Sequence, residues 1–349
     1  MAPPQSETHN PLGQQDAELR SIYLDFMRRI CFDNSAEACS PDSWPQVSAA
    51  LTALCRPFVP AAVIKMSSTF GSLVCKHHPV DAQVKIAHLT ALVIVIDDLA
   101  QSLTGEARDV FLEDLALFQL KMCNPQGYAS AHPGRGDLHW VLEDFMHFLR
   151  TEQNPFFPAH PRTLTMLVKS SFDFLEGNLL EQYYHEHPIN YIPEMQLFCS
   201  FLRAKSGVAE AFTCFLLMDT SGDVTSPMFE DRFYYHNIHP LVPEIVQCFN
   251  LINDVLSFYK ELEDGDTAIT ILINANVKKL SSLDSLRDVI DVVVDHWIRV
   301  MAIIEASGSL EWKKRIQQFY QGYTAWHMGG SRYLFKQLLG DWFQGEFSW

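Results

Sequence analysis

The segment that most limits what this chain can fold into is residues 84–99. Its apolar side chains recur at helical spacing and cover more than half of the helix circumference. Such a helix is stable in water only when other helices surround it, as in a packed helical barrel. The strongly apolar run inside it, residues 91–96, ends at Asp97 and Asp98 and is far too short to span a membrane.

The rest of the chain repeats this helical pattern, and no segment shows the strict polar–apolar alternation that is typical of strands. Proline, glycine and asparagine residues separate the apolar stretches. The predicted helices are 18–31, 48–55, 61–76, 84–99, 106–122, 137–151, 161–185, 192–216, 228–236, 241–262, 267–277, 283–304 and 311–338. We therefore predict an all-α fold with a single domain, residues 18–340.

Three segments are expected to lie outside the packed helices. Residues 1–17 are rich in Pro, Gln, Asn and Ser, which predicts a disordered N-terminal segment. Residues 123–136 combine Gly, Pro and Ser, which predicts an inserted surface loop. Residues 341–349 are expected to form a C-terminal tail.

Composition excludes some classes of partner. The formal net charge is −16, so nucleic acid is not expected as a partner, and no polybasic membrane patch is visible. The eight cysteines lack a Cys-x-x-Cys pair, as is typical of reduced thiols in an intracellular protein. The N-terminus has no signal-peptide core. We predict a soluble, cytoplasmic protein without membrane insertion.

A stripe of polar side chains marks the predicted helix 241–262. At ~100° per residue, Asn253, Ser257, Lys260 and Glu261 fall within an arc of about 100°. Amide, hydroxyl and carboxylate oxygens suit Mg²⁺, and an ammonium group suits an anion that shares the metal, such as a phosphate. The stripe therefore predicts a metal site that also binds an anion.

The neighbours of this stripe are apolar. Phe249 and Ile245 continue the same arc toward the start of the helix. A stripe that changes from apolar to ligand-bearing predicts the wall of a pocket with a polar mouth. A solvated helix face is the alternative when the Asn and Ser residues are considered alone.

Two adjacent carboxylates form a second candidate site. Asp97 and Asp98 lie at the negative end of the apolar helix, so a cation is needed to compensate them. We expect Asp97 to bind metal. We expect Asp98 either to pair with an arginine or to contact the metal ligands without touching the metal itself. An exposed acidic cap is the alternative.

Two further signals are weak when taken alone. Gly207, four residues after Arg203, can open a helix and free a carbonyl group. Arg332 and Tyr333, expected late in the last long helix, can donate a guanidinium fork and a phenol to phosphate oxygens.

Together these motifs resemble class I terpene cyclases, and most closely the fungal trichodiene synthase group. Residues 253–261, with the sequence NDVLSFYKE, are similar to that group's Asn-Asp-x-x-Ser-x-x-x-Glu metal motif. Asp97-Asp98 resembles the start of its aspartate-rich motif, and residues 174–183 resemble its Phe-x-Glu-Gly…Glu-Gln-Tyr segment. The motifs follow the family's order over residues 65–335.

The resemblance implies a class I terpenoid synthase fold, an α-helical barrel around a central apolar active-site cavity. It implies three Mg²⁺ ions, for which Mn²⁺ can substitute. The implied metal ligands are Asp97, Asp98, Asn253, Ser257 and Glu261. The implied contacts to the diphosphate are Arg203, Lys260, Arg332 and Tyr333, with Gly207 at the helix break and Phe70, Phe174, Phe249 and Trp326 lining the cavity.

The expected reaction also follows from the resemblance. Farnesyl diphosphate is the expected substrate, with geranyl and geranylgeranyl diphosphate left open. The expected product is a cyclised terpene hydrocarbon or alcohol of fungal secondary metabolism, released with diphosphate by an enzyme that can form a homodimer. Gln101 stands where the family's first motif usually carries a third acid.

Other functions stay open. A chain-elongating prenyltransferase carries two aspartate-rich motifs, whereas the second motif here has Asn, Ser and Glu, which favours cyclisation. A class II cyclase needs Asp-x-Asp-Asp, and Val95 stands at its first acidic position. A non-catalytic helical protein would bind prenyl chains without depending on Mg²⁺.

Overall fold

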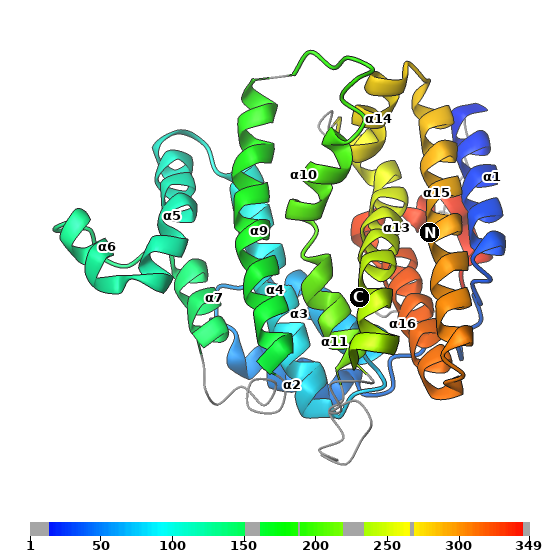
Figure 1. Ribbon diagram of the computed structural model, residues 1–349, viewed down its shortest axis with the longest axis horizontal. Helices are drawn as coiled ribbons and strands as arrows, with labels where there is room; N and C mark the ends of the chain where they lie inside the picture. Colours follow the sequence, from blue (N-terminus) through cyan, green and yellow to red (C-terminus); the bar gives the residue numbers. More distant parts are fainter. Residues whose placement is uncertain (1–13, 151–160, 188, 219–233, 266–268, 345–349) are drawn as a thin grey trace, which may run out of the picture.

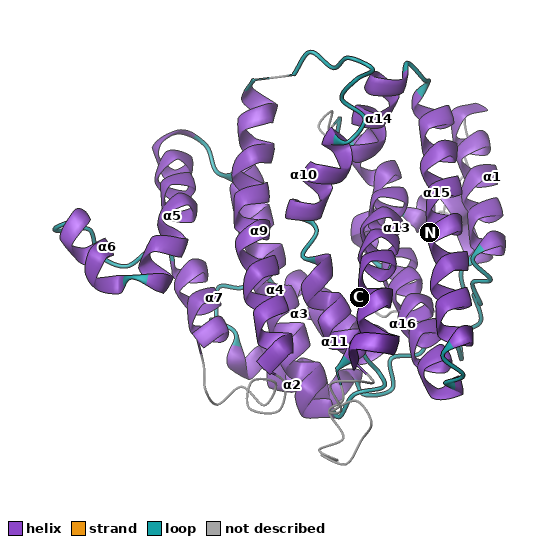
Figure 2. Ribbon diagram, in the orientation of Figure 1, coloured by secondary structure: helices purple, strands orange, loops and turns teal. Residues whose placement is uncertain are grey.

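The computed structural model describes residues 14–150, 161–187, 189–218, 234–265 and 269–344. Within these ranges the regular structure is helical and contains no strand (Figure 2). The α-helices are α1 Gln14–Arg29, α2 Trp44–Leu54, α3 Ala61–Thr69, α4 Val80–Ser102, α5 Gly105–Cys123, α6 Pro125–Ala131, α7 Trp140–Arg150, α9 Pro161–Glu186, α10 Phe198–Ser206, α11 Ala209–Leu217, α13 Val242–Glu263, α14 Thr270–Lys278, α15 Ser282–Ala306, α16 Leu310–Gly329 and α17 Phe335–Leu339. Shorter turns are η1 Phe70–Val74, η3 Tyr234–Ile238, η4 His239–Leu241, η5 Ser331–Tyr333 and η6 Gly340–Trp342.

Local sequence chemistry sets several helix starts. The Ser281 side chain accepts a hydrogen bond from the Asp284 amide at the start of α15, and Ser309 does the same for Trp312 in α16. These hydroxyls satisfy amide groups that have no partner inside the helix. Proline stands in the first turn of α2, α6 and α13, where its missing N–H costs nothing.

Long helices form the body of the molecule around α4 and α13 (Figure 1). Helix α4 packs against α2, α3, α7 and α9, and α13 packs against α11, α15 and α16. Helices α5 and α6 extend from one side, whereas α1 lies against α15 on the other (Figure 1). The Tyr23 hydroxyl of α1 donates to the Val255 carbonyl at 2.9 Å, which ties the N-terminal helix to α13. The prediction that α4 is largely enclosed is confirmed.

Two glycines allow helices to approach closely. A Cβ atom on Gly322 of α16 would lie 2.5 Å from the Leu73 carbonyl oxygen of η1. A Cβ atom on Gly177 of α9 would lie 2.7 Å from the Ser206 Cα atom of α10. Any larger side chain at these positions would therefore push the helices apart.

Three predicted helices are shorter than expected. The segment 192–216 is interrupted at Gly207, so that α10 and α11 are separate helices. The segment 311–338 is also wrong as one helix, because α16 ends at Gly329 and Arg332 lies in the turn η5. Leu334, with φ of 60°, has a left-handed conformation that a continuous helix does not allow. The expected helix 61–76 likewise changes from α3 into the wider turn η1.

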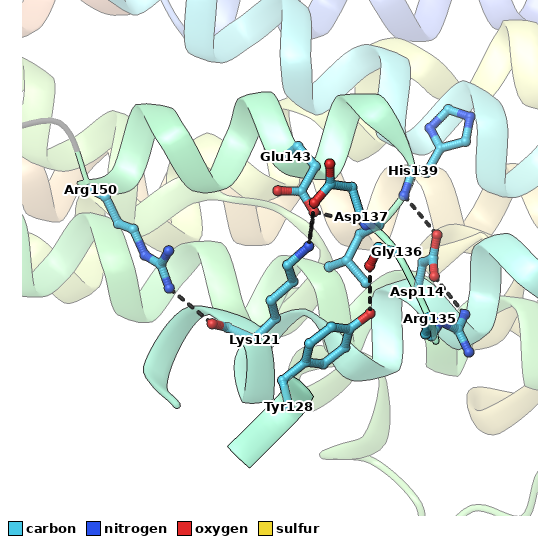
Figure 3. Close-up of polar contacts among 10 residues, drawn as sticks. Asp114, Lys121, Tyr128, Arg135, Gly136, Asp137, His139, Glu143 and Arg150 are labelled. Carbon is cyan, nitrogen blue, oxygen red and sulfur yellow. Dashed lines mark hydrogen bonds and ion pairs between the residues drawn. The ribbon is translucent and has the colours of Figure 1, made fainter. Parts of the chain in front are cut away.

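The expected surface loop 123–136 contains the helix α6. Figure 3 shows the polar contacts around it. Arg135 of the segment lies 2.6 Å from Asp114 of α5, and the Lys121 ammonium group of α5 lies 2.6 Å from Glu143 of α7. The segment is thus a fixed helical projection.

The two chain ends also differ from expectation. Residues 14–17 are helical instead of disordered, and residues 1–13 lie outside the described part. In the expected tail, the Gln344 amide donates to the Asn34 carbonyl at 3.3 Å. The predicted helix 228–236 lies mostly outside the described residues. Among the helices that the structure describes, none is both long and apolar enough to cross a membrane.

Candidate active site

A cavity of about 510 Å³ lies between α4, α9, α10, α11, α13 and α16. Its volume falls within the ~300–1,000 Å³ that is usual for small-molecule sites. The predicted site residues that line it are Phe70, Asp97, Phe174, Arg203, Gly207, Phe249, Asn253, Ser257, Lys260, Glu261, Trp326, Arg332 and Tyr333. The exceptions are Asp98, which is not among the lining residues, and Ile245, which is fully buried in the core.

The stripe on α13 forms one wall of the cavity mouth, as its spacing predicted. Asn253, Ser257 and Glu261 all line the cavity. Ser257 is buried, and within the described residues its hydroxyl has no hydrogen-bond partner. A buried, unpaired oxygen at a cavity wall fits a ligand that is bound there, since such groups otherwise lose stability. The donor set of amide, hydroxyl and carboxylate oxygens fits Mg²⁺.

Arg203 faces this stripe from α10. Its Nη2 atom donates to the Asn253 Oδ1 atom at 2.7 Å, and its Nε atom lies 2.8 Å from Asp254 Oδ1. Burial raises the pKa of the Asp254 carboxyl, and the Arg203 guanidinium opposes that shift. Asp254 was part of the predicted motif but had no role assigned to it. Its position shows that it holds Arg203 at the cavity.

The break between α10 and α11 lies directly beside this arginine. Val208 has φ of 48°, a left-handed conformation that is uncommon for a β-branched residue. A Cβ atom on Gly207 would lie 1.9 Å from the Asn250 Oδ1 atom, so any larger residue there would displace the buried Asn250 side chain. Strained backbone of this kind costs about 1–3 kcal/mol and persists where the surrounding packing imposes it.

The opposite wall of the mouth carries Asp97, at the end of α4. Gln101 donates to its Oδ1 atom at 3.2 Å, and an Arg332 nitrogen lies 3.9 Å from its Oδ2 atom. The pKa of Asp97 is raised, chiefly because the fold removes the carboxyl from water, while Arg332 opposes the shift. Asp98 pairs with Arg332 at 3.0 Å, which confirms its predicted arginine partner.

His327 on α16 is a site residue that sequence reasoning missed. Its Nε2 atom lies 3.0 Å from Asn253 Nδ2, and its Nδ1 atom lies 2.9 Å from the Tyr323 carbonyl oxygen. Burial lowers the pKa of His327 to about 3. A histidine one turn after a tyrosine, in an aromatic helix, was the available signal.

Aromatic rings form the floor of the cavity. Phe249 stacks on Tyr323 with ring centroids 4.1 Å apart, and Phe70 meets Trp326 edge to face at 5.3 Å. The Trp326 indole N–H donates to the Met66 carbonyl at 2.9 Å, so this polar group is satisfied by protein. The floor therefore consists of aromatic rings and hydrocarbon below the polar mouth.

In the part of the chain that the structure describes, clusters made only of the usual metal-binding side chains do not occur. Within the described ranges, no three His, Cys, Asp or Glu side chains gather around a possible ion position. A metal at the mouth would therefore need the amide and hydroxyl oxygens of α13 in addition to carboxylates.

Comparisons with known proteins identify the family to which this chain belongs. The family model for trichodiene synthase (TRI5) matches residues 43–344. The (E)-beta farnesene synthase of Metarhizium brunneum is 26% identical over 285 residues, which cover 79% of this chain and 75% of that protein. Among solved structures, α-eudesmol synthase superposes with a TM-score of 0.54 at 11% identity, covering 97% of this chain and all of the other.

A second structure, isoprene synthase from grey poplar, gives a TM-score of 0.54 at 15% identity. The match covers 94% of this chain but 59% of that longer one. The fold is the all-α fold of class I terpene synthases. The match to the trichodiene synthase family model shows that this chain is an enzyme of that class. It belongs to the trichodiene synthase family.

Proposed function

We propose that this chain is a Mg²⁺-dependent sesquiterpene cyclase that ionises farnesyl diphosphate and cyclises the resulting cation. The observation that carries the proposal is one cavity with an oxygen-rich mouth above an aromatic floor. The name of the Metarhizium relative, a farnesene synthase, supports the choice of farnesyl diphosphate. The poplar structure was solved with three Mg²⁺ ions and dimethylallyl-S-thiolodiphosphate, which supports the choice of metal and of a prenyl diphosphate substrate.

The mouth is the proposed diphosphate site. Asp97 on α4 and the oxygens of Asn253, Ser257 and Glu261 on α13 would hold Mg²⁺. Bound Mg²⁺ would neutralise the diphosphate and help it to leave as an anion. Asp98 supports this wall through Arg332.

Hydrogen-bond donors on several helices would also bind the diphosphate leaving group. Arg203, Lys260, Arg332 and Tyr333 line the cavity and would donate to diphosphate oxygens. Lys260 lies 3.2 Å from Asp264, so this contact would be exchanged for one with the substrate. Stabilising negative charge on the leaving group lowers the barrier to breaking the allylic C–O bond.

The floor would govern the carbon chemistry. Faces of Phe70, Phe174, Phe249 and Trp326 would attract the carbocation and exclude water from it. Cytoplasmic location, a homodimeric state and a role in secondary metabolism stay predictions. Geranyl and geranylgeranyl diphosphate are the other candidate substrates.

Product analysis tests this function. The protein is incubated separately with geranyl, farnesyl and geranylgeranyl diphosphate, with Mg²⁺, with Mn²⁺ and with neither, and the extracts are analysed by gas chromatography. Cyclised C15 products that require a divalent metal are expected from farnesyl diphosphate. Products that form only when isopentenyl diphosphate is added would instead identify an elongating transferase. Metal-independent binding without turnover would identify a non-catalytic prenyl-binding protein.

A further inference from the structure

His327 lies in a rigid aromatic enclosure behind the α13 stripe. Its side chain is fully buried, and its ring centroid lies 4.5 Å from that of Tyr323, 4.7 Å from Trp326 and 4.5 Å from Tyr333. These contacts leave the ring little room to turn. Its two nitrogens therefore keep fixed directions.

Hydrogen-bond chemistry assigns the proton on this ring. The Nδ1 atom lies 2.9 Å from the Tyr323 carbonyl oxygen, which can only accept, so Nδ1 carries the hydrogen. The Nε2 atom, 3.0 Å from Asn253 Nδ2, then presents a lone pair to the amide NH₂ group.

The same orientation follows independently from the other side of the amide. Arg203 Nη2, which can only donate, lies 2.7 Å from the opposite amide atom, which must therefore be the oxygen. Asn253 has one oxygen and one nitrogen at these ends, so the contacts with Arg203 and His327 agree on the orientation of the amide. The chain of contacts runs from the Tyr323 carbonyl through His327 to the Asn253 amide nitrogen, and from the Asn253 oxygen to Arg203.

We propose that His327 is a positioning residue, which keeps the oxygen of Asn253, and not its NH₂ group, on the side of the amide that faces Arg203 and the cavity. An amide is nearly symmetric in shape, so a flip would present two N–H donors to a cation. Partners behind a metal ligand commonly fix its orientation in this way. The inference rests on the proposed function, because it assumes that Asn253 binds the metal.

The test measures Mg²⁺ binding instead of turnover. Mg²⁺ is titrated calorimetrically into the full chain in the presence of saturating inorganic diphosphate. H327L removes the acceptor and is expected to weaken Mg²⁺ binding by about 10–100-fold. H327Q retains an acceptor oxygen and is expected to recover most of the affinity. H77L is the matched control, because both His77 ring nitrogens are buried and have no partner within the described residues.

The same substitution of His327 in a second variant, N253D, distinguishes a role in orienting Asn253 from a role in packing. A carboxylate offers an oxygen at both ends, so N253D needs no orienting partner. In the N253D background, H327L is therefore expected to change Mg²⁺ affinity by less than about threefold. Circular dichroism checks that each variant folds, and H327M replaces H327L in the same comparison if H327L does not fold.

The outcomes distinguish a failure of the proposed role of His327 from a failure of the metal assignment of Asn253. Equal losses from H327L in the Asn253 and N253D backgrounds would show that His327 only packs, and would overturn the inference. So would wild-type affinity in H327L. If N253A itself bound Mg²⁺ and diphosphate as tightly as the wild type, the metal assignment of the proposed function would fail, and the inference with it.

Discussion

Both walls of the cavity mouth carry oxygen-bearing side chains, but they differ in how strongly other residues hold these side chains in place. On the α13 wall, Ser257 is buried and Asn253 is held between Arg203 and His327. On the α4 wall, the side chains of Asp97 and Asp98 are 31% and 40% exposed, and their protein contacts come from Gln101 and Arg332.

The α13 wall is therefore the more preorganised of the two, and the α4 wall, whose contacts can exchange, is the more adaptable. The α13 oxygens stand on one long helix, and the Asn253 amide is also held by Arg203 and His327, so that side chain loses little conformational freedom when a ligand binds. The α4 carboxylates are held by a surface amide and an arginine, both of which can exchange partners. We expect substitutions on the α13 wall to reduce turnover more than those on the α4 wall.

The largest effect is expected from E261A, which removes the one carboxylate of the α13 stripe. The kcat for farnesyl diphosphate should fall by about three orders of magnitude, because the leaving group loses charge stabilisation. E263A, an exposed glutamate at the end of the same helix, is the control and should stay within about twofold of wild type. Near-normal turnover by E261A would remove this residue from the metal site.

On the α4 wall, D97N and D98N should differ from each other. D97N removes a carboxylate that lines the cavity and should lower kcat by about 100-fold, whereas D98N loosens Arg332 and should lower it by about tenfold. Steady-state kinetics at several Mg²⁺ concentrations would measure both. The reverse order would show that Asp98 is the stronger metal ligand.

Without metal, the same D97N substitution should stabilise the fold. The raised pKa of Asp97 means that folding opposes its ionisation, so D97N should raise the melting temperature at neutral pH, on the order of 2 °C. The difference should disappear as the pH falls through the raised pKa, because the wild-type carboxyl is then neutral as well. A less stable variant at neutral pH would mean that attraction to Arg332 outweighs the loss of hydration.

The smallest effect is expected from Q101A. The side chain is exposed and gives Asp97 a single hydrogen bond of 3.2 Å, so kcat should change by less than about threefold. A loss comparable to that of D97N would show that Gln101 itself contributes to the metal site, and the α4 wall would then be more preorganised than its contacts suggest.

Local patterns in the sequence were sufficient for the helical fold and for the stripe on α13, because both depend on spacing within one helix. The end of α16 before Arg332 was not predictable in this way, since the left-handed Leu334 depends on packing. The role of His327 was hidden for a similar reason. Its partner Asn253 is 74 residues away in the sequence, and only the fold brings them together.

The hydrogen bond from Trp326 to the Met66 carbonyl limits which substitutions of the cavity floor could lead to a new product. The ring belongs at once to the cavity floor and to the joint between α16 and α3. A substitution there changes the shape offered to the substrate and also loosens two helices. Phe174 contributes only hydrocarbon to the floor. We expect single mutational steps toward a different terpene to be tolerated more readily at Phe174 than at Trp326.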